Sequence, residues 1–412
     1  MKILIIIGDG MADRPIKELG GLTPLEAARA GNMNKLASLG VSGLLTVLGT
    51  GLAPGSDVAC LALLGYDYSH VYKGRGGLEA AGAGIPIEES DLAFRCDFAT
   101  VDGDFRIVDE RAGRINGLEA EELARSLEDM KLKNHGVEVV FKHIGGHKGV
   151  LILKGENLSP NIKAEQPKIS RPAIESIRPE DNSPKAQRTA QMLRELVVKS
   201  NKLLEDHPVN KRRLLEGRPP ANIVIPWGVG LKPKLNSIHD KYGLKGACVA
   251  AANVIKGVCK LCGMNILHVE GATGDLRTNV IAKAEAALRA LENHNLVFVH
   301  VEASDEASHD GDVYGKIEAI RKIDRMVGVI LEAVNLDEVC IALTADHATP
   351  TKLRIHTADP TPISIACNDV VPDGVQVYSE RAAYDGGLGH IRGCDVMPTL
   401  LNIAGNPVKV GI

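Results

Sequence analysis

Residues 2–9, Lys2-Ile3-Leu4-Ile5-Ile6-Ile7-Gly8-Asp9, place a carboxylate directly after a run of branched apolar residues. An unbroken apolar run of this kind is typical of a strand buried on both faces, as in a parallel sheet covered by helices. Two later runs repeat the arrangement, because 296–301 precedes Asp305 and 339–343 precedes Asp346. Ligands of open α/β sheets bind at the carboxyl ends of the strands, so we expect these three carboxylates on one rim.

Strand-like and helical patterns alternate outward from this first run. Thr23, Pro24 and Glu26 form a capping box that predicts a helix ending at Gly40. The alternation returns near residue 222 with a strand at 223–225, a helix at 247–262 and further strand-helix pairs toward the end of the chain. This order predicts an α/β fold in which a mostly parallel sheet is covered on both faces.

The middle of the chain has a different pattern. Strand-like pieces lie among helical pieces, and a polar, proline-rich stretch at 159–184 precedes an amphipathic helix at about 185–205. A chain of 412 residues is also longer than a single core usually holds. We therefore predict an inserted, smaller α+β domain at 79–221 within a discontinuous domain formed by 1–78 and 222–412.

Composition excludes several classes of protein. The net charge is −4 and the sequence has no long basic run, so no nucleic-acid partner is expected. No segment is apolar for long enough to span a membrane, and the first apolar run does not resemble a signal peptide. These features predict a cytoplasmic protein whose eight cysteines are reduced, with Cys259 and Cys262 as core residues rather than a zinc pair. They do not indicate an oligomeric state.

Histidines accompany the carboxylates. Asp305 and His309 are four residues apart, which places both side chains on one face of a helical turn. His347 directly follows Asp346, so the pair could serve two different ions, and His356 follows a short loop later. Mixed carboxylate and imidazole ligands suit manganese, zinc or another divalent ion better than an all-oxygen cage does. Together with Asp9 these residues predict a two-metal site.

Ser56 follows the glycine-rich loop 49–55 and begins a helical pattern. A serine at this position is most often a helix cap. The free N–H groups and dipole of a helix N-terminus also favour anions, and a hydroxyl activated by a metal can attack phosphorus. The residues alone leave both roles open.

Six segments resemble the archaeal-type 2,3-bisphosphoglycerate-independent phosphoglycerate mutases of the alkaline phosphatase superfamily. They are Gly8–Pro15, Pro54–Asp57, Arg111–Ile115, Gly271–Gly274, Asp305–His309 and Asp346–Pro350. The resemblance covers essentially the whole chain. It implies an alkaline-phosphatase-like three-layer domain with a mostly parallel sheet, and an inserted substrate-binding domain.

The resemblance also implies a reaction and its residues. Such an enzyme is an isomerase that interconverts 3-phosphoglycerate and 2-phosphoglycerate in glycolysis and gluconeogenesis, through a phosphoserine and without 2,3-bisphosphoglycerate. Ser56 would be the nucleophile. Two divalent ions, manganese first and zinc, cobalt or magnesium as alternatives, would be held by Asp305, His309 and His356 and by Asp9, Ser56, Asp346 and His347. The substrate would be bound by Arg111, Arg114, His147 and Lys245.

The chain departs from the family pattern around the expected substrate site. Residues 164–168 replace a usual Asp/Pro/His stretch, Lys148 replaces an arginine, and Trp227 replaces an arginine before a Gly-x-Gly. The Trp-Gly variant resembles a branch for which a homoserine-phosphorylating role has been proposed. Phosphotransfer to a small hydroxy substrate such as homoserine, and phosphomonoester hydrolysis, are therefore the alternatives to the mutase reaction. The sequence lacks a Gly-x-x-x-x-Gly-Lys-Ser/Thr loop, so a kinase of that type is not expected.

Overall fold

The computed structural model describes residues 1–128, 130 and 136–409. The chain divides into two compact units, Met1–Val71 with Leu235–Ile412, and Tyr72–Lys234. The second unit is wider than the expected range 79–221. It is wider because α5 (Arg75–Gly82) packs on β3 (Leu92–Val101), and β9 (Ile223–Gly230) pairs with β3 in an antiparallel ladder.

A mixed sheet forms the centre of the first unit, in the part of the chain that the structure describes. From β11 to β13 its strands are parallel, whereas β14 is antiparallel to both β13 and β2. The mostly parallel α/β sheet predicted from the sequence is confirmed. In spatial order the strands are β11 (Asn265–Ile266), β10 (Gly246–Val249), β12 (Leu296–Val301), β1 (Lys2–Gly8), β13 (Val339–Thr344), β14 (Thr361–Ala366), β2 (Val41–Thr46) and β15 (Gly389–Arg392).

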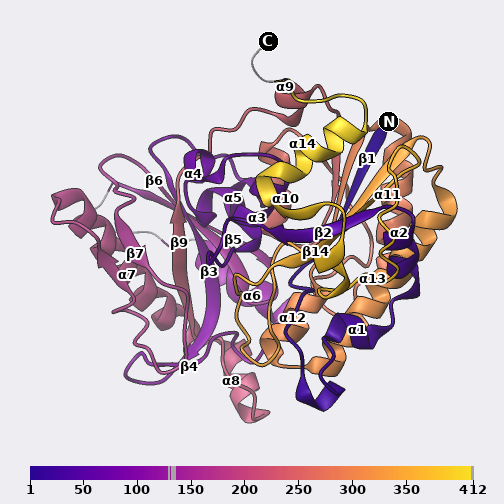
Figure 1. Cartoon of the computed structure of the whole chain (residues 1–412). Coiled ribbons are helices and arrows are strands. Elements are labelled where there is room, and N and C mark those ends of the chain that lie inside the picture. Colours follow the sequence, from indigo (N-terminus) through magenta and orange to yellow (C-terminus); the bar gives the residue numbers. More distant parts are fainter. Residues whose placement is uncertain (129, 131–135, 410–412) are drawn as a thin grey trace. The chain divides into compact units, whose positions relative to one another are not determined.

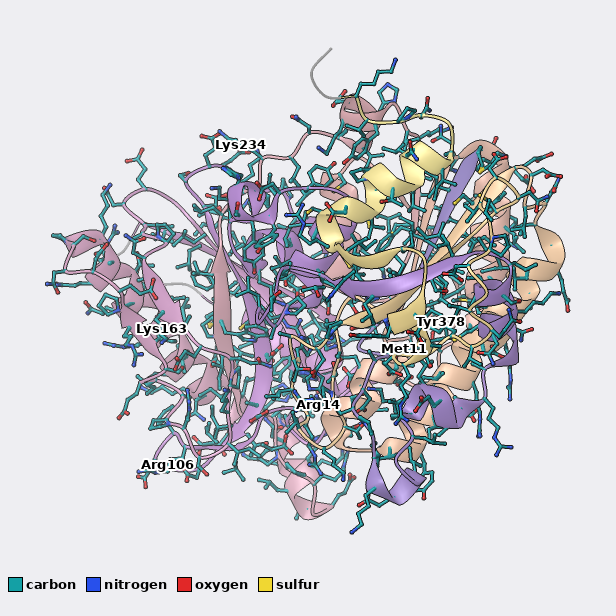
Figure 2. All side chains as sticks on the ribbon, viewed as in Figure 1. Met11, Arg14, Arg106, Lys163, Lys234 and Tyr378 are labelled. Atoms are coloured by element: carbon teal, nitrogen blue, oxygen red, sulfur yellow. The ribbon has the colours of Figure 1, made fainter. Side chains whose placement is uncertain are left out.

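Helices cover both faces of this sheet (Figure 1). On one face Leu4 and Ile6 of β1 pack into a core that also contains Met11 and Tyr378, which are labelled in Figure 2. The helices of this face are α1 (Pro24–Ala28), α2 (Gly31–Ser38), α11 (Val280–Asn293) and α13 (Val313–Ala333). The other face carries α3 (Ser56–Leu63), α10 (Asn253–Leu261) and α14 (Gly393–Ile403). Shorter elements are η1 (Lys17–Leu19), α4 (Tyr68–Val71), α9 (Ile238–Tyr242), α12 (Ala303–Asp310) and η2 (Ala382–Asp385).

Two helices differ from the sequence prediction. The capping box at Thr23 is present, but α1 ends at Ala28 because Arg29 adopts a left-handed conformation with φ 53°, and α2 begins separately at Gly31. Residues 246–249 form β10 rather than the start of a helix, since they pair with β12. Sheet pairing overrides the local pattern there.

The second unit is α+β, as expected. Its sheet runs β4 (Ile107–Asp109), β3, β6 (Lys148–Lys154) and β5 (Glu138–Gly145), and β9 pairs with β3. A small hairpin pairs β7 (Ile162–Ala164) with β8 (Ile177–Pro179). The helices are α5, α6 (Gly117–Glu128), α7 (Pro184–Leu204) and α8 (Pro208–Leu215). Among the described residues of either unit, no helix combines the length and apolarity needed to cross a bilayer.

Glu119 of α6 anchors a cluster of arginines in the second unit. Its carboxylate accepts hydrogen bonds from Arg213 at 2.8 Å and from Arg218 at 2.8 and 2.9 Å, and the Arg213 side chain is only 2% exposed. The hydrogen bonds from these arginines outweigh burial and lower the pKa of Glu119 to about 2. Removing this carboxylate would leave the buried Arg213 charge poorly compensated.

We expect Glu119→Gln to lower the free energy of unfolding of this unit by about 1–3 kcal/mol at neutral pH. Because the folded pKa is depressed, the difference from wild type should be complete above the ordinary value of 4.5 and should disappear as the pH falls toward 2. Urea unfolding followed by the fluorescence of the sole tryptophan, Trp227, measures this difference. Exposed Glu121 on the same helix supplies the control, Glu121→Gln, and equal losses in both variants would contradict the prediction.

Candidate active site

The carboxyl ends of three adjacent strands gather the predicted acidic residues. β1 lies between β12 and β13 and is parallel to both, with Ile7 opposite His300 on one side and Thr344 on the other. Asp9 follows β1, Asp346 follows β13, and Asp305 lies on α12 directly after β12. The structure therefore places the three carboxylates on one rim of the first unit.

Gly10 fits closely between the ligand-bearing segments of this rim. Its backbone has φ +59°, and a Cβ there would lie 2.6 Å from both Asp305 Oδ1 and Thr349 Oγ1. Any side chain would both strain the backbone and enter the cluster of carboxylates. A glycine after Asp9 is thus required by the close approach of the strand ends.

The three histidines are each held through Nδ1. The Nδ1–H of His309 donates to Arg354 O at 2.8 Å, and that of His356 donates to Pro54 O at 2.9 Å. Thr349 Oγ1 donates its proton to Asp305 Oδ1 at 2.7 Å, so it accepts the Nδ1–H of His347 at 3.0 Å. With the proton fixed on Nδ1, each ring turns the lone pair of Nε2 toward the carboxylates, as metal-bound histidines do.

The Nε2 atoms and carboxylate oxygens then form two adjoining clusters. In the first, His309 Nε2 lies 3.1 Å from His356 Nε2 and 3.2 Å from Asp305 Oδ2. In the second, His347 Nε2 lies 3.1 Å from Asp9 Oδ1 and 3.5 Å from Asp346 Oδ2. Acceptor atoms at these separations repel one another unless a proton or a cation lies between them.

Buried acceptors in the second cluster indicate a cation. Within the described residues, Asp9 Oδ1 and Asp346 Oδ2 are buried and have no hydrogen-bond partner. Burial, followed by the charges of Asp346 and Asp305, raises the pKa of Asp9 well above its ordinary value. For Asp305, burial raises the pKa, but the nearby imidazoles of His309 and His356 outweigh it and the pKa is lowered. Carboxylate and imidazole donors in this arrangement fit divalent metal ions.

Ser56 lies at the second cluster. It is the first residue of α3, and its Oγ is 3.1 Å from His347 Nε2. The side chain is partly exposed, so a substrate can reach it. The residues that the resemblance assigned to two ions are thus brought together, and the hydroxyl is beside them.

Sequence reasoning missed the residues that support the ligands. Fully buried Lys316 of α13 donates from Nζ to Asp13 Oδ2 at 2.9 Å, Ala12 O at 3.1 Å and Thr349 O at 3.0 Å. It thereby joins the segment after β1 to the segment after β13. Nothing in the spacing of Lys316 distinguishes it from the other residues of an amphipathic helix. Thr349 gave a weak signal, since it lies two residues after His347.

We expect Thr349→Val to weaken manganese binding by about 10- to 100-fold, because the hydroxyl orients ligands of both clusters at once. Titration calorimetry of chelator-stripped protein measures the affinity. Thr361→Val is the control, since buried Thr361 donates to Ala345 O at 3.0 Å without touching a candidate ligand. Unchanged affinity in the Thr349 variant would sink the assignment of this hydroxyl.

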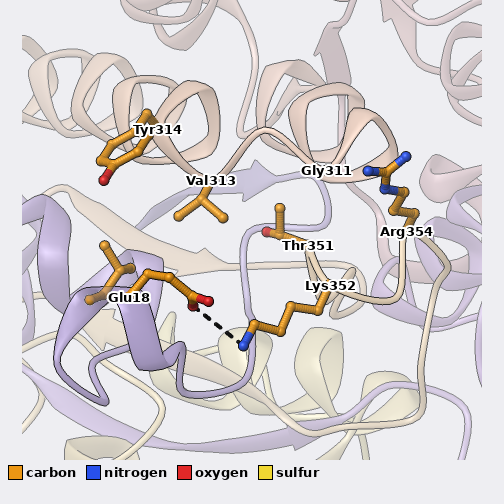
Figure 3. Close-up of a pocket in the computed structure, with 8 residues that line it drawn as sticks. Glu18, Gly311, Val313, Tyr314, Thr351, Lys352 and Arg354 are labelled. Carbon is orange, nitrogen blue, oxygen red and sulfur yellow. Dashed lines mark ion pairs between the residues drawn. The ribbon is translucent and has the colours of Figure 1, made fainter.

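Figure 3 shows a pocket of about 340 Å³ whose lining includes Arg354 and Lys352. Glu18 and Lys352 pair across it at 3.4 Å. Arg354 packs against Gly311, where a Cβ would lie 2.5 Å from the guanidinium, and the carbonyl of Arg354 is the acceptor that orients His309. None of the candidate metal ligands lines this pocket, so the pocket is distinct from the two ligand clusters.

The expected substrate residues are distributed over both units. In the second unit Asp109 accepts from the backbone of Arg111 at 2.8 Å and of Gly113 at 3.0 Å, which shapes the turn that carries Arg111 and Arg114. Burial lowers the pKa of His147 to about 4, and the charges of Lys148, Arg95 and, least, Arg111 act in the same direction although Asp97 opposes the shift.

Lys245, which the family resemblance assigns to substrate binding, lies far from the candidate metal ligands. It is exposed and precedes β10, and its carbonyl accepts from Asn295 N and Leu296 N at the start of β12. Because β10 and β12 are parallel, Lys245 lies at the amino ends of the strands, on the edge opposite Asp9. The structure does not bring it to the metal ligands.

Trp227 is the centre of a charged cluster in the second unit. Its indole N–H donates to Asp97 Oδ2 at 2.7 Å, and the guanidinium carbons of Arg75 and Arg95 lie 5.2 and 5.7 Å from its ring centroid. Buried Arg95 also pairs with Asp97 at 2.6 Å and with Glu79 at 2.9 Å. The residue that departs most from the family pattern is therefore embedded in a satisfied network.

Known proteins match this chain over its full length. The family described as 2,3-bisphosphoglycerate-independent phosphoglycerate mutase matches residues 37–210. A protein of that name from Methanocaldococcus jannaschii is 43% identical over 410 residues, which cover 100% of this chain and 99% of the relative. The chain belongs to the 2,3-bisphosphoglycerate-independent phosphoglycerate mutase family.

Other similar proteins also match this chain over nearly its full length. A phosphoglycerate mutase of the same description from Methanopyrus kandleri is 44% identical over 416 residues, covering 100% of this chain and 98% of the relative. The solved cofactor-independent phosphoglycerate mutase from Thermoplasma acidophilum has a TM-score of 0.64 and 34% identity, covering 98% of this chain and 100% of that one. A solved protein from Pyrococcus horikoshii has a TM-score of 0.84 and 36% identity, covering 100% of this chain and 99% of that one.

Membership of the mutase family confirms the resemblance, the fold and the enzyme class predicted from the sequence. It favours phosphoglycerate interconversion over the homoserine and phosphatase alternatives. The name of the family also states independence from 2,3-bisphosphoglycerate, in agreement with the expected cofactor requirement.

Proposed function

We propose that this chain interconverts 3-phosphoglycerate and 2-phosphoglycerate through a phosphoserine at Ser56. The observation that carries the proposal is the position of the Ser56 hydroxyl at the N-terminus of α3, 3.1 Å from His347 Nε2 and beside the second ligand cluster. On this proposal the enzyme acts in glycolysis and gluconeogenesis, in the cytoplasm. Two divalent ions, manganese first, are its cofactors.

On this proposal, different groups of the first unit have different roles in phosphoryl transfer. Ser56 Oγ loses its proton and attacks phosphorus, the bond between phosphorus and the 3-oxygen of glycerate breaks, and that oxygen takes up a proton. Backbone N–H groups at the start of α3 stabilise the phosphoryl oxygens. Ions held by Asp305, His309 and His356 and by Asp9, Asp346 and His347 would favour the Ser56 alkoxide and offset charge on the phosphoryl group. The 2-hydroxyl of glycerate then loses its proton and attacks phosphoserine, the bond between phosphorus and Ser56 Oγ breaks, and Oγ takes up a proton again.

Arg111, Arg114 and His147 are the proposed ligands of the substrate's phosphate and carboxylate. Arginine suits both groups because its planar fork makes paired hydrogen bonds. The resemblance also names Lys245, but its position at the opposite strand ends makes it the weakest member of this set.

Incubation of the manganese-loaded protein with 3-phosphoglycerate tests the proposal. We expect 2-phosphoglycerate, detected directly by phosphorus NMR, and a phosphate on the peptide that contains Ser56. Release of inorganic phosphate without 2-phosphoglycerate would contradict a mutase and indicate hydrolysis. Phosphate found on another residue would contradict the role of Ser56 while leaving the overall reaction in place.

A further inference from the structure

His300 is a fully buried imidazole that the two-metal site leaves unexplained. It lies on β12 and has 0% exposure. Within the described part of the chain, neither of its ring nitrogens has a hydrogen-bond partner. Buried polar groups in folded proteins are nearly always satisfied, so an imidazole with two unmatched nitrogens indicates a missing partner.

Three donors of different chemistry converge at His300. One ring nitrogen of His300, the sulfur of Cys60 and a carboxylate oxygen of Asp346 all lie within 4.8 Å of one another, and all three residues are buried. Cys60 is four residues after Ser56, so it lies on the same face of α3 one turn further along the helix. Asp346 is shared with the second ligand cluster.

The distances fit a tetrahedral ion. His300 Nε2 lies 3.6 Å from Asp346 Oδ2 and 3.7 Å from Asp9 Oδ2. Two ligands of a tetrahedral zinc ion, each about 2.0–2.2 Å from the metal, lie about 3.3–3.6 Å from each other. The observed separations are too long for hydrogen bonds and close to this value.

We propose that Cys60, His300 and Asp346 form a third cation site, which adjoins the second ligand cluster and shares Asp346 with it, with Asp9 Oδ2 as the nearest fourth donor. Thiolate, imidazole and carboxylate together select zinc, or cobalt as its spectroscopic substitute, over manganese or magnesium. Binding forms a bond from the metal to the Cys60 sulfur and releases the thiol proton to water. The site rests on this donor geometry and does not depend on the mutase reaction.

Cobalt absorption distinguishes this site from the other two, because their candidate ligands are only oxygen and nitrogen donors. We expect cobalt titration of the chelator-stripped protein to produce a thiolate-to-cobalt charge-transfer band in the near ultraviolet. Cys60→Ala should abolish the band while the remaining cobalt still binds. Cys340→Ala, which removes a fully buried thiol on strand β13 of the same unit, should leave the band unchanged.

The wild-type protein provides a measurement that needs no variant. Crystals grown with zinc should show anomalous density between Cys60, His300 and Asp346, in addition to density at the two ligand clusters. Absence of a charge-transfer band at saturating cobalt, its persistence in Cys60→Ala, or zinc density confined to the two clusters would overturn the proposal. In the last case His300 would be a protonated partner of Asp346 and Asp9.

Discussion

Replacing Ser56 with alanine should lower phosphoglycerate interconversion at least about 1000-fold, because the variant has no oxygen to carry the phosphoryl group. The loss should fall on kcat, since Ser56 is a single partly exposed hydroxyl at the start of α3 and the ligands around it remain. Coupled measurement of 2-phosphoglycerate formation, together with mass spectrometry of the isolated enzyme, tests both the rate and the loss of covalent phosphate.

Ser69→Ala is the matched control for this experiment. Ser69 is exposed in the same unit and contacts Asp67, away from the ligand clusters. Its replacement should leave the rate within experimental error. Substantial turnover by the Ser56 variant would show that phosphate passes to product by another route.

Exhaustive chelation should abolish activity, and added manganese should restore it. The physical reason lies in the packing of acceptors, since His347 Nε2 and Asp9 Oδ1 are 3.1 Å apart and His309 and His356 approach equally closely. Without cations these groups must bind protons or move apart, and Ser56 loses the positive charge that favours its ionised form. Assays after dialysis against a chelator, with metal content measured in parallel, test the expectation.

The variant Asp305→Asn distinguishes an effect of lost metal from general damage caused by the chelator. Asp305→Asn keeps the shape of the side chain but removes the charge that His309 and His356 face. We expect it to need much higher manganese for any activity. Turnover that survives in fully metal-free wild-type protein would rule out a metal-dependent reaction.

Much of the fold follows from local sequence, and the exceptions have physical causes. The apolar run at 2–7 correctly predicts a central parallel strand, because a strand buried on both faces needs no polar alternation. The range 247–262 was predicted as one helix, yet its first residues pair with β12. A short run of small apolar residues fits either structure, and only the neighbouring strand decides between them.

The sequence predicted the candidate metal ligands but not the residues that hold them in place. Asp9, Asp305 and Asp346 follow strands, so topology places them together. Thr349 and Lys316 support the ligands through contacts between segments far apart in the chain, and such contacts leave no periodic trace in the sequence. Lys245 was predicted to bind the substrate but lies at the amino ends of the strands, away from the metal ligands. Its position depends on where β10 begins, which the sequence pattern did not reveal.

The hydrogen bond from His356 Nδ1 to Pro54 O has a consequence for engineering the chain. Pro54 lies in the loop that precedes Ser56, the proposed nucleophile, and His356 belongs to the first ligand cluster. This one hydrogen bond therefore couples the loop to the cluster. Lengthening or exchanging loop 49–55 would rotate an imidazole as well as displace Ser56. Designs that alter substrate choice should therefore leave this loop untouched and vary the second unit, where Trp227 and its neighbours lie.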